Sequence, residues 1–422
     1  MLQEPFIWDS FSDQPAQLKD RAFKKQMRRV ELFSLVKTYL LALLLLPLAL
    51  IMTPFIRRKH INSKDFFCLG IDFERYPDES LEMISDLKVE RILLRFKLWE
   101  MDTLPQLKQF IMTCHTQKIT LKIIQDRENI TDLTLLTTNL RLIFSELGKH
   151  IDMFEIGTTI NRAKWGFFSV GEYNRFYQTA YNLREKEFSD LKLIGSGAID
   201  FEFHFTAHTL FNFTPYRYDG VSSLLYVDRR GAPENLQLGF DLSDKIALLS
   251  TLVWLSPKSA HEVHITETNW PISNTAPYAP TSEYECVSEE LYAAFMLRYY
   301  LLAFASQQVN SLSWHQLIAP GYGLVDSRDG LRKREAYYVY KTMVEKLSSA
   351  QFLRLDIKRG YYICQFLVDD ELLQIHWALT PTSLANMDNF EVTSYTGEPI
   401  TSEELAINET PIYIKIKNEN QL

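Results

Sequence analysis

Runs of large apolar residues alternate with amphipathic segments from about residue 66 to residue 347. The segments between the runs carry apolar residues three and four positions apart, which is the period of a helix that buries one face. Eight runs have the length and composition of buried strands: FFCLGID (66–72), VERILLRFK (89–97), ITLKIIQD (119–126), IDMFEIGTT (151–159), LKLIGSGAID (191–200), GVSSLLYVD (220–228), EVHITETNW (262–270) and VNSLSWHQL (309–317). Eight strand–helix repeats predict an α/β fold of the (β/α)8, or TIM-barrel, type over residues 66–347.

An open, doubly wound sheet is the alternative arrangement for the same alternation. Nucleotide-binding forms of that sheet carry a GxGxxG or GxxxxGK[ST] motif after their first strand. Neither motif follows residues 66–72, so the pattern favours the closed barrel.

The pattern changes after Ser348, where short runs with a period of two are separated by turn residues. In the run IYIKIK (412–417), apolar and basic side chains alternate, as expected for a strand with one face on a core and the other in water. Residues 348–422 are therefore predicted to form a small C-terminal β domain.

The N-terminal part contains an uncharged stretch, YLLALLLLPLALIMTPFI (39–56). About 18 apolar residues, at ~1.5 Å per residue, suffice to cross a bilayer as a helix. We predict a basic N-terminal segment at 1–37, one transmembrane helix at 38–56 and a linker at 57–65. A cleaved signal peptide is the alternative, but no small-x-small cleavage site follows the run.

The charges on either side of this stretch predict its orientation. More Lys and Arg residues precede the stretch than follow it directly, so the positive-inside rule puts residues 1–37 in the cytoplasm. The barrel would then lie outside the cytoplasm, in the periplasm if the cell is bacterial.

The net charge of −8 comes from the part beyond residue 64, which argues against nucleic acid as a partner.

The cysteine and histidine patterns give no sign of a metal or cofactor. Four cysteines are scattered without a CxxC spacing, and the histidines form no HExxH motif. We therefore expect neither a metal site nor a cofactor.

Candidate catalytic residues are sought at the C-terminal ends of the strands, where TIM barrels hold their active sites. The seventh run ends in the carboxylate of Glu267, followed by Asn269 and Trp270, and the eighth run contains Trp314 in LSWHQL. In this order the motifs resemble the retaining (β/α)8-barrel glycoside hydrolases of the cellulase-, xylosidase- and iduronidase-like clan. The resemblance covers roughly residue 66 to the C-terminus, and it implies Glu267 as nucleophile and Trp314 as the floor of a sugar subsite.

The fourth run departs from the pattern of that clan. Thr158 and Thr159, in FEIGTTINRAKWG, stand where the family carries Asn-Glu, the Glu being the general acid/base. Retaining hydrolysis needs two carboxyl groups ~5–5.5 Å apart, and a threonine hydroxyl is no comparable acid. Glu155 is expected to be a buried structural carboxylate paired with Arg95. The candidates to replace the missing acid/base are Asp126, Glu128 and Glu234.

The remaining candidate residues would bind the substrate, and all of them lie at strand ends or in the loops that follow. They are Arg95, Asn161, Arg162, Lys164, Trp165, Tyr226, Asn269, Trp270 and Trp314. Arg162 and Lys164 suit an anionic saccharide, such as a uronic or phosphorylated sugar. The other interpretation is that they form salt bridges on an acidic surface.

Two functions follow from these residues. The first is a membrane-anchored retaining glycoside hydrolase or transglycosylase that acts on cell-envelope polysaccharide or oligosaccharide. The second is a non-catalytic, carbohydrate-binding pseudoenzyme in a polysaccharide assembly system. Glu267 favours the first function and Thr159 the second. Carbohydrate and membrane are the expected partners, and the sequence indicates no partner protein.

Overall fold

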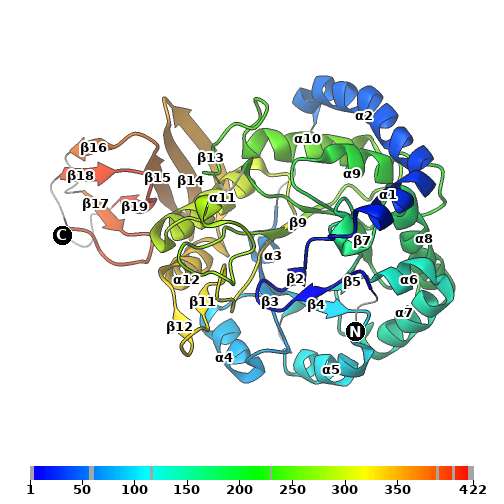
Figure 1. Cartoon of the computed structure of the whole chain (residues 1–422). Helices are drawn as coiled ribbons and strands as arrows, with labels where there is room; N and C mark the ends of the chain where they lie inside the picture. Colours follow the sequence, from blue (N-terminus) through cyan, green and yellow to red (C-terminus); the bar gives the residue numbers. More distant parts are fainter. Residues whose placement is uncertain are drawn as a thin grey trace.

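Eight parallel strands close into a barrel in the order β10-β3-β4-β5-β6-β7-β8-β9 (Figure 1). The computed structural model describes residues 4–56, 61–114, 117–228, 231–385, 389–401 and 404–416. The barrel strands are β3 (Phe67–Ile71), β4 (Arg91–Lys97), β5 (Lys118–Ile124), β6 (Met153–Ile156), β7 (Leu193–Ile199), β8 (Gly220–Leu224), β9 (Val263–Thr268) and β10 (Ser311–Trp314). Each coincides with one of the eight predicted runs, and only β5 begins one residue before its run, so the predicted TIM barrel is confirmed.

Helices surround the barrel and bury their apolar faces against it. They are α4 (Pro77–Leu87), α5 (Leu104–Thr113), α6 (Arg127–Thr131), α7 (Leu133–Leu147), α8 (Val170–Glu187), α9 (Phe203–Leu210), α10 (Leu242–Leu255), α11 (Glu289–Ser306) and α12 (Glu335–Leu347). Side-chain caps begin several of them. Asp241 and Asp244 form a reciprocal capping box at the start of α10, and the Ser169 hydroxyl accepts the Glu172 amide at the start of α8.

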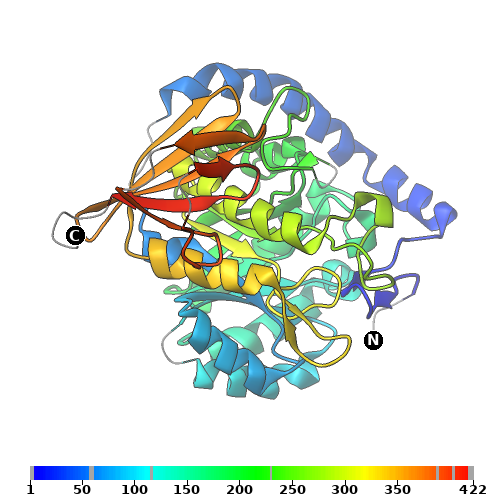
Figure 2. The same ribbon diagram turned by 90° about the vertical axis from the view of Figure 1, so that its left-hand side faces the viewer.

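The C-terminal residues form antiparallel sheets that pack on α11 (Figure 2). The larger sheet has the order β13 (Gln351–Lys358), β14 (Tyr361–Val368), β15 (Glu371–Ala378), β19 (Ile412–Ile416) and β17 (Phe390–Thr393). A second sheet pairs β16 (Thr382–Ala385) with β18 (Glu404–Ile407). Phe304 of α11 stacks on Phe366 of β14, which joins the barrel core to the sheet. The predicted small β domain is thus present, and we propose residue 348, between α12 and β13, as its boundary.

The predicted apolar helix is present as α2 (Leu32–Met52), which begins six residues before the predicted start. With the following turn η1 (Thr53–Phe55), it is the one helix within the described ranges that is long and apolar enough to cross a membrane. In the structure α2 lies against α9 and α10 on the outside of the barrel (Figure 1). Residues 57–60 of the predicted linker lie outside the described residues.

One face of α2 is polar or small, and this face meets the barrel. The Ser34 hydroxyl accepts the Gly171 amide at 2.9 Å, and the buried Thr38 hydroxyl lies 2.8 Å from His208 Nδ1. Ala49 is completely buried further along the same face. The opposite face exposes large apolar side chains: Leu32, Phe33, Val36, Tyr39, Leu40, Leu43, Leu44, Leu48, Leu50 and Ile51.

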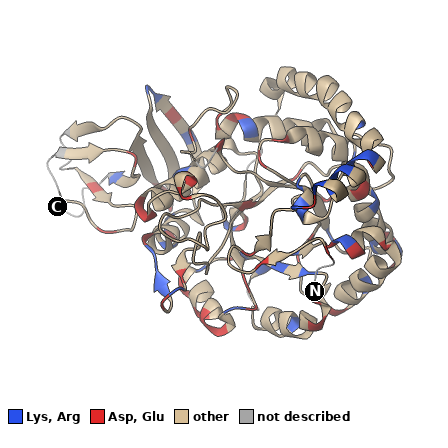
Figure 3. Ribbon diagram, viewed as in Figure 1, with Lys and Arg blue, Asp and Glu red and all other residues tan. Residues whose placement is uncertain are grey.

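The residues before α2 fold back over the barrel. Strands β1 (Trp8–Asp9) and β2 (Gln14–Pro15) pair antiparallel, and we call residues 8–15 the N-terminal hairpin. It is followed by α1 (Arg21–Val30), where basic side chains gather (Figure 3). In Figure 1 the blue hairpin lies across the ring of barrel strands. The sequence pattern gave no prediction of this contact.

Candidate active site

A cavity of about 230 Å³ opens at the C-terminal ends of the barrel strands. Its walls come from the strand ends, the loops after them and the N-terminal hairpin. The lining residues are Ser12, Asp13, Gln14, Arg95, Thr159, Arg162, Lys164, Trp165, Ile199, Asp200, Tyr226, Glu267, Asn269, Pro280, His315 and Tyr322. Six of the candidate residues thus share this cavity with Glu267: Arg95, Arg162, Lys164, Trp165, Tyr226 and Asn269.

Glu267 projects from β9 into the cavity, with 15% of its side chain exposed. The Tyr226 hydroxyl donates a hydrogen bond to its Oε1 at 2.9 Å, and Lys122 Nζ lies 3.2 Å from its Oε2. Burial opposes ionisation of this carboxyl, but Lys122, His315, Arg95 and the Tyr226 hydrogen bond outweigh it and lower the pKa to about 2. The group is therefore a carboxylate at neutral pH.

Glu155 lies on β6, beneath Glu267, and is completely buried. Lys122 Nζ is 3.5 Å from its Oε2, and the Thr266 hydroxyl donates to its Oε1 at 2.8 Å. Burial raises the pKa of this carboxyl despite the lysine. The predicted burial is confirmed, whereas the predicted pairing with Arg95 is wrong because Lys122 of the neighbouring strand holds the carboxylate instead.

Arg95 is instead paired with the N-terminal hairpin. Its Nη1 lies 2.5 Å from Asp13 Oδ2, and its Nη2 donates to the Asp13 carbonyl at 3.3 Å. Burial opposes ionisation of Asp13, but Arg95, Lys97, Arg75 and His315 lower its pKa below the ordinary range. Asp13 therefore contributes a second carboxylate to the cavity.

At the end of β6, Thr159 lines the cavity where the resemblance implies a catalytic Glu. Its neighbour Thr158 is fixed through its backbone, since the Gln125 side-chain amide both accepts its N–H and donates to its carbonyl, each at 2.9 Å. Both threonine side chains are buried, and their hydroxyls lie 3.3 Å apart. No carboxyl group belongs to either residue, so the end of β6 supplies no acid.

The three candidates for the acid/base are absent from the residues that line the cavity. Asp126 caps α6 by accepting the Asn129 amide at 2.8 Å, and burial raises its pKa. Glu128 is exposed on the same short helix. Glu234 is paired with Arg298 of α11 and accepts the Trp377 indole N–H at 2.8 Å. These contacts give Asp126 and Glu234 structural roles away from Glu267, and Glu128 lies outside the cavity.

The basic loop after β6 is largely matched by acidic side chains. Arg162 lies 2.6 Å from Asp200 and 2.8 Å from Glu202, and Asn161 also donates to Glu202. Lys164 donates to the Gln14 side chain of the hairpin at 2.6 Å. For Arg162, the salt-bridge interpretation therefore describes the structure.

Two of the candidate aromatic residues point away from the cavity. Trp314 is completely buried, stacks on Trp270 with ring centroids 5.7 Å apart and donates its indole N–H to Tyr292 at 2.7 Å. Trp270 is also completely buried. The predictions that Trp314 floors the subsite and that Trp270 binds substrate are therefore wrong, because neither ring presents a surface to a ligand.

His315, which follows Trp314, faces the cavity instead. Its ring stacks on Tyr322 with centroids 5.3 Å apart, and burial lowers its pKa to about 4, so the imidazole is neutral at pH 7. Sequence analysis missed both residues. The alternation of side chains along β10 was the available signal, since Trp314 and His315 are neighbours and point to opposite faces of the strand.

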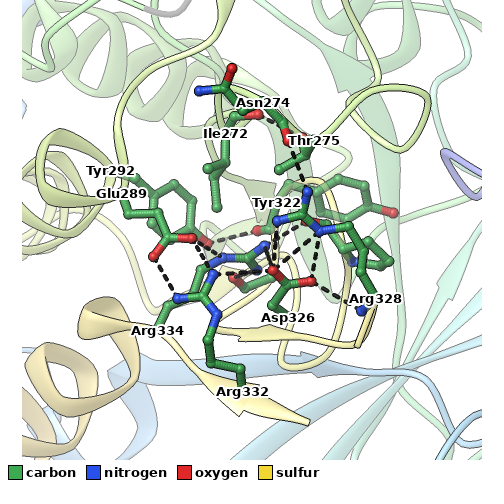
Figure 4. A network of polar contacts seen from close by, with 12 residues as sticks. Ile272, Asn274, Thr275, Glu289, Tyr292, Tyr322, Asp326, Arg328, Arg332 and Arg334 are labelled. Atoms are coloured by element: carbon green, nitrogen blue, oxygen red, sulfur yellow. Dashed lines mark hydrogen bonds and ion pairs between the residues drawn. The ribbon is translucent and has the colours of Figure 1, made fainter. Parts of the chain in front are cut away.

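A charged network holds the loop that carries Tyr322 (Figure 4). Asp326 accepts from Arg328 at 2.8 Å and pairs with Arg334 at 3.2 Å, and its pKa lies well below the ordinary range because these cations outweigh its burial. Tyr292 donates to the Tyr322 carbonyl at 2.7 Å. The charged residues of this loop are thus paired with one another, and their network supports one wall of the cavity.

Comparisons with known proteins find similarity in structure but not in sequence. No family model matches the chain, and no curated protein matches it by sequence. A family 39 glycoside hydrolase from Bacteroides cellulosilyticus WH2 is similar in structure, with a TM-score of 0.63 and 13% identity over 85% of this chain and 82% of that one. The chain has the fold of (β/α)8 glycoside hydrolases.

Two further structures have the same fold. A family 39 β-xylosidase from Caulobacter crescentus has a TM-score of 0.59 and 11% identity, and the match covers 86% of this chain and 98% of that one. A family 30 endoxylanase from Clostridium papyrosolvens C71 has a TM-score of 0.57 and 8% identity, over 86% of this chain and 97% of the enzyme. Both matches extend well beyond the barrel length alone, so the similarity includes a barrel with an attached β domain.

Proposed function

We propose that this protein is a retaining glycosidase-like enzyme of the cell envelope in which Glu267 is the nucleophile. The observation that carries the proposal is the state of Glu267: it lies in a cavity at the mouth of the barrel, is bound by Tyr226 and Lys122, and has a pKa of about 2. The similarity to glycoside hydrolases in fold supports a saccharide as the substrate class.

In the proposed reaction, a Glu267 oxygen attacks the anomeric carbon while the bond from that carbon to the leaving oxygen breaks. A natural alkoxide leaving group needs a proton, which an acid beside the scissile bond normally supplies. Thr159 has no such proton to give, and the other carboxylates of the cavity, Asp13 and Asp200, are each paired with an arginine. We therefore expect activated aryl glycosides to react much faster than natural ones.

Labelling with 2-fluoro aryl glycosides of several sugars tests this proposal. We expect the mass of one glycosyl group on the peptide that contains Glu267, and no labelling of Glu267→Gln. Glu79→Gln, the same change at an exposed site on α4, is the matched control and should label like the wild type. Absence of labelling with every sugar would contradict the proposed nucleophile.

The missing acid gives a second, independent test. Thr159→Glu introduces a carboxyl group at the end of β6, and general acid catalysis commonly contributes ~10²–10⁴-fold. We expect hydrolysis of oligosaccharides to rise by about 10²-fold or more, with little gain for aryl glycosides, whose departure needs no proton. Equal effects on both substrates would show that protonation does not limit the reaction.

The alternative function is a non-catalytic carbohydrate-binding subunit of a polysaccharide assembly system. It is favoured by Thr159 and by the N-terminal hairpin, which forms part of the wall of the cavity. Oligosaccharide binding that is unchanged in Glu267→Gln, together with failure of wild-type labelling, would support this alternative over the enzyme.

We also propose that α2 attaches the protein to a membrane. The support is its exposed apolar face and the neighbouring basic helix α1, whose cations suit anionic lipid headgroups (Figure 3). The single-pass topology, with residues 1–37 in the cytoplasm and the barrel in the periplasm, requires the hairpin and the barrel mouth to lie on opposite sides of the bilayer. In that topology the hairpin cannot lie at the mouth of the barrel, where the structure places it.

Reporters fused after Leu422 and before Met1 distinguish the two arrangements. Signals on opposite sides of the membrane would support the spanning helix and require the hairpin to leave the mouth. Signals on the same side, with the protein still in the membrane fraction, would support a helix that lies in the membrane surface against α9 and α10. A protein that stays in the soluble fraction would contradict both.

A further inference from the structure

The N-terminal hairpin forms one wall of the cavity and holds side chains at the mouth of the barrel. Its Trp8 ring packs against Trp99 and Trp165, with centroids 5.2 and 6.0 Å away. Tyr322 donates a hydrogen bond to the Ser12 carbonyl at 3.3 Å. Aromatic contacts from two sides and polar groups at the end are also the contacts of a bound saccharide. A ligand that binds these same side chains must therefore displace the hairpin.

Asp13 is the hairpin carboxylate that reaches into the cavity. It lies 2.5 Å from Arg95, and each of the two side chains is 9% exposed. Throughout the described ranges, Asp13 is the one carboxylate within ion-pair distance of Arg95. When the hairpin leaves, a buried guanidinium therefore loses its paired anion, and a buried cation without a partner is unfavourable.

Two neighbouring cations of the cavity keep their partners when the hairpin leaves. Lys122 holds Glu155 and Glu267. Arg162 is bound by two carboxylates from the loop after β7. Neither pairing involves the hairpin, so Arg95 is the cavity arginine whose ion pair comes from the hairpin.

We propose that Arg95 is a carboxylate-binding subsite, that Asp13 fills it in the absence of ligand, and that the ligand is a saccharide carrying a uronic-acid carboxylate. The inference rests on the proposed saccharide function and names its substrate class. A neutral sugar that displaces the hairpin leaves Arg95 unpaired, whereas a uronate replaces one carboxylate by another. The site thus selects against a neutral ligand because that ligand leaves the charge of Arg95 unpaired.

The test measures binding of a matched pair of ligands, methyl β-D-glucuronide and methyl β-D-glucoside, which differ in the carboxylate. Asp13→Asn removes the competing charge, so we expect the glucuronide to bind about tenfold or more tightly than to the wild type, as one charged hydrogen bond provides. The glucoside should change less than about twofold. Asp9→Asn is the control, since Asp9 bonds to Phe11 and Ser12 inside the hairpin.

A double variant, Asp13→Asn with Arg95→Gln, keeps the experiment interpretable. It neutralises both partners together, so it leaves no unpaired buried charge to unfold the protein. We expect it to bind both glycosides equally. A preference for glucuronide that survives in the double variant would overturn the assignment to Arg95.

The remaining outcomes separate this inference from the proposed function. If Asp13→Asn binds both glycosides equally, the carboxylate subsite is overturned and the saccharide site stands. If neither glycoside binds while Glu267 is still labelled by aryl glycosides, the uronate class alone is overturned. If neither glycoside binds and Glu267 is not labelled, both the inference and the proposed function are contradicted.

Discussion

Two carboxyl groups of the barrel share one lysine, but their pKa values are shifted in opposite directions. Glu155, inside the barrel, and Glu267, at the mouth, both lie within 3.5 Å of Lys122 Nζ. The pKa of Glu155 is raised by burial, whereas that of Glu267 is lowered to about 2 because several cations outweigh its burial. Depth in the same barrel thus separates a carboxyl whose pKa is raised from one whose pKa is lowered.

The surroundings of the two groups explain the difference. Glu267 has the Tyr226 hydroxyl and the nearby charge of Arg95 in addition to the lysine. Glu155 has hydroxyl groups around it and is completely enclosed. The two carboxyl groups share the one lysine, and the additional groups at the mouth give Glu267 the lowered pKa.

Removing the shared lysine should have the largest effect. Lys122→Met leaves two carboxyl groups buried without their cation, and breaking a buried pair in this way costs ~3–5 kcal/mol. Urea unfolding at pH 7 measures the loss. The double variant with Glu155→Gln should recover part of it, since one of the uncompensated groups is gone. A loss below about 1 kcal/mol would contradict the role of Lys122 as shared counterion.

The two carboxylates should affect acid stability with opposite signs. The folded-state pKa of Glu267 lies below the ordinary 4.5, so its stabilisation is present above pH 4.5 and is lost as the pH falls towards 2. The difference corresponds to about 3 kcal/mol. The raised pKa of Glu155 acts the other way: its contribution is present at low pH and is lost as the pH rises through the folded-state value.

Urea unfolding midpoints measured between pH 2.5 and 7 report the sign of both contributions to stability. Glu267→Gln should flatten the loss of stability towards acid pH, and Glu155→Gln should steepen it. Equal changes in the two variants would contradict the opposite shifts of the two pKa values.

The smallest effect is expected for the hydrogen bond at the mouth. Tyr226→Phe removes one donor to an ionised carboxylate but leaves the lysine, so we expect a loss of about 1 kcal/mol and a higher pKa of Glu267. The pH dependence of labelling by the fluoro-glycosides reports that pKa. Tyr322→Phe removes a hydroxyl that bonds to Ser12 and not to Glu267, and it should leave the profile unchanged.

The barrel and its nucleophile candidate could be predicted because their signals are local. The strands lie in runs that are rich in apolar residues, as parallel strands buried on both faces require. Glu267 lies near the end of one such run and faces the cavity. Trp314 was placed at the subsite because its motif resembles that of the glycoside hydrolases, whereas its ring is buried against Trp270 and its neighbour His315 faces the cavity.

The N-terminal hairpin could not be predicted for a different reason. Its contact between Asp13 and Arg95 joins residues that are 82 positions apart. No sequence periodicity connects these two residues, and each of them alone has the features of an ordinary surface charge. The apolar run of α2 lies between them and suggested a separation by a bilayer. The pairing of these two charges is therefore seen only in the three-dimensional structure.

The polar stripe along α2 has a consequence for how the protein is made. Within this chain α2 precedes every barrel strand, and its partners on α9 and α10 begin at Phe203. At ~5–20 residues per second, the ribosome adds those partners roughly 10–30 s after α2 has been translated. During that interval the Thr38 hydroxyl has no His208 to contact. The contact of α2 with α9 and α10 therefore forms only after β3 to β7 have been translated, so the order of synthesis leaves this helix without two of its neighbours for that time.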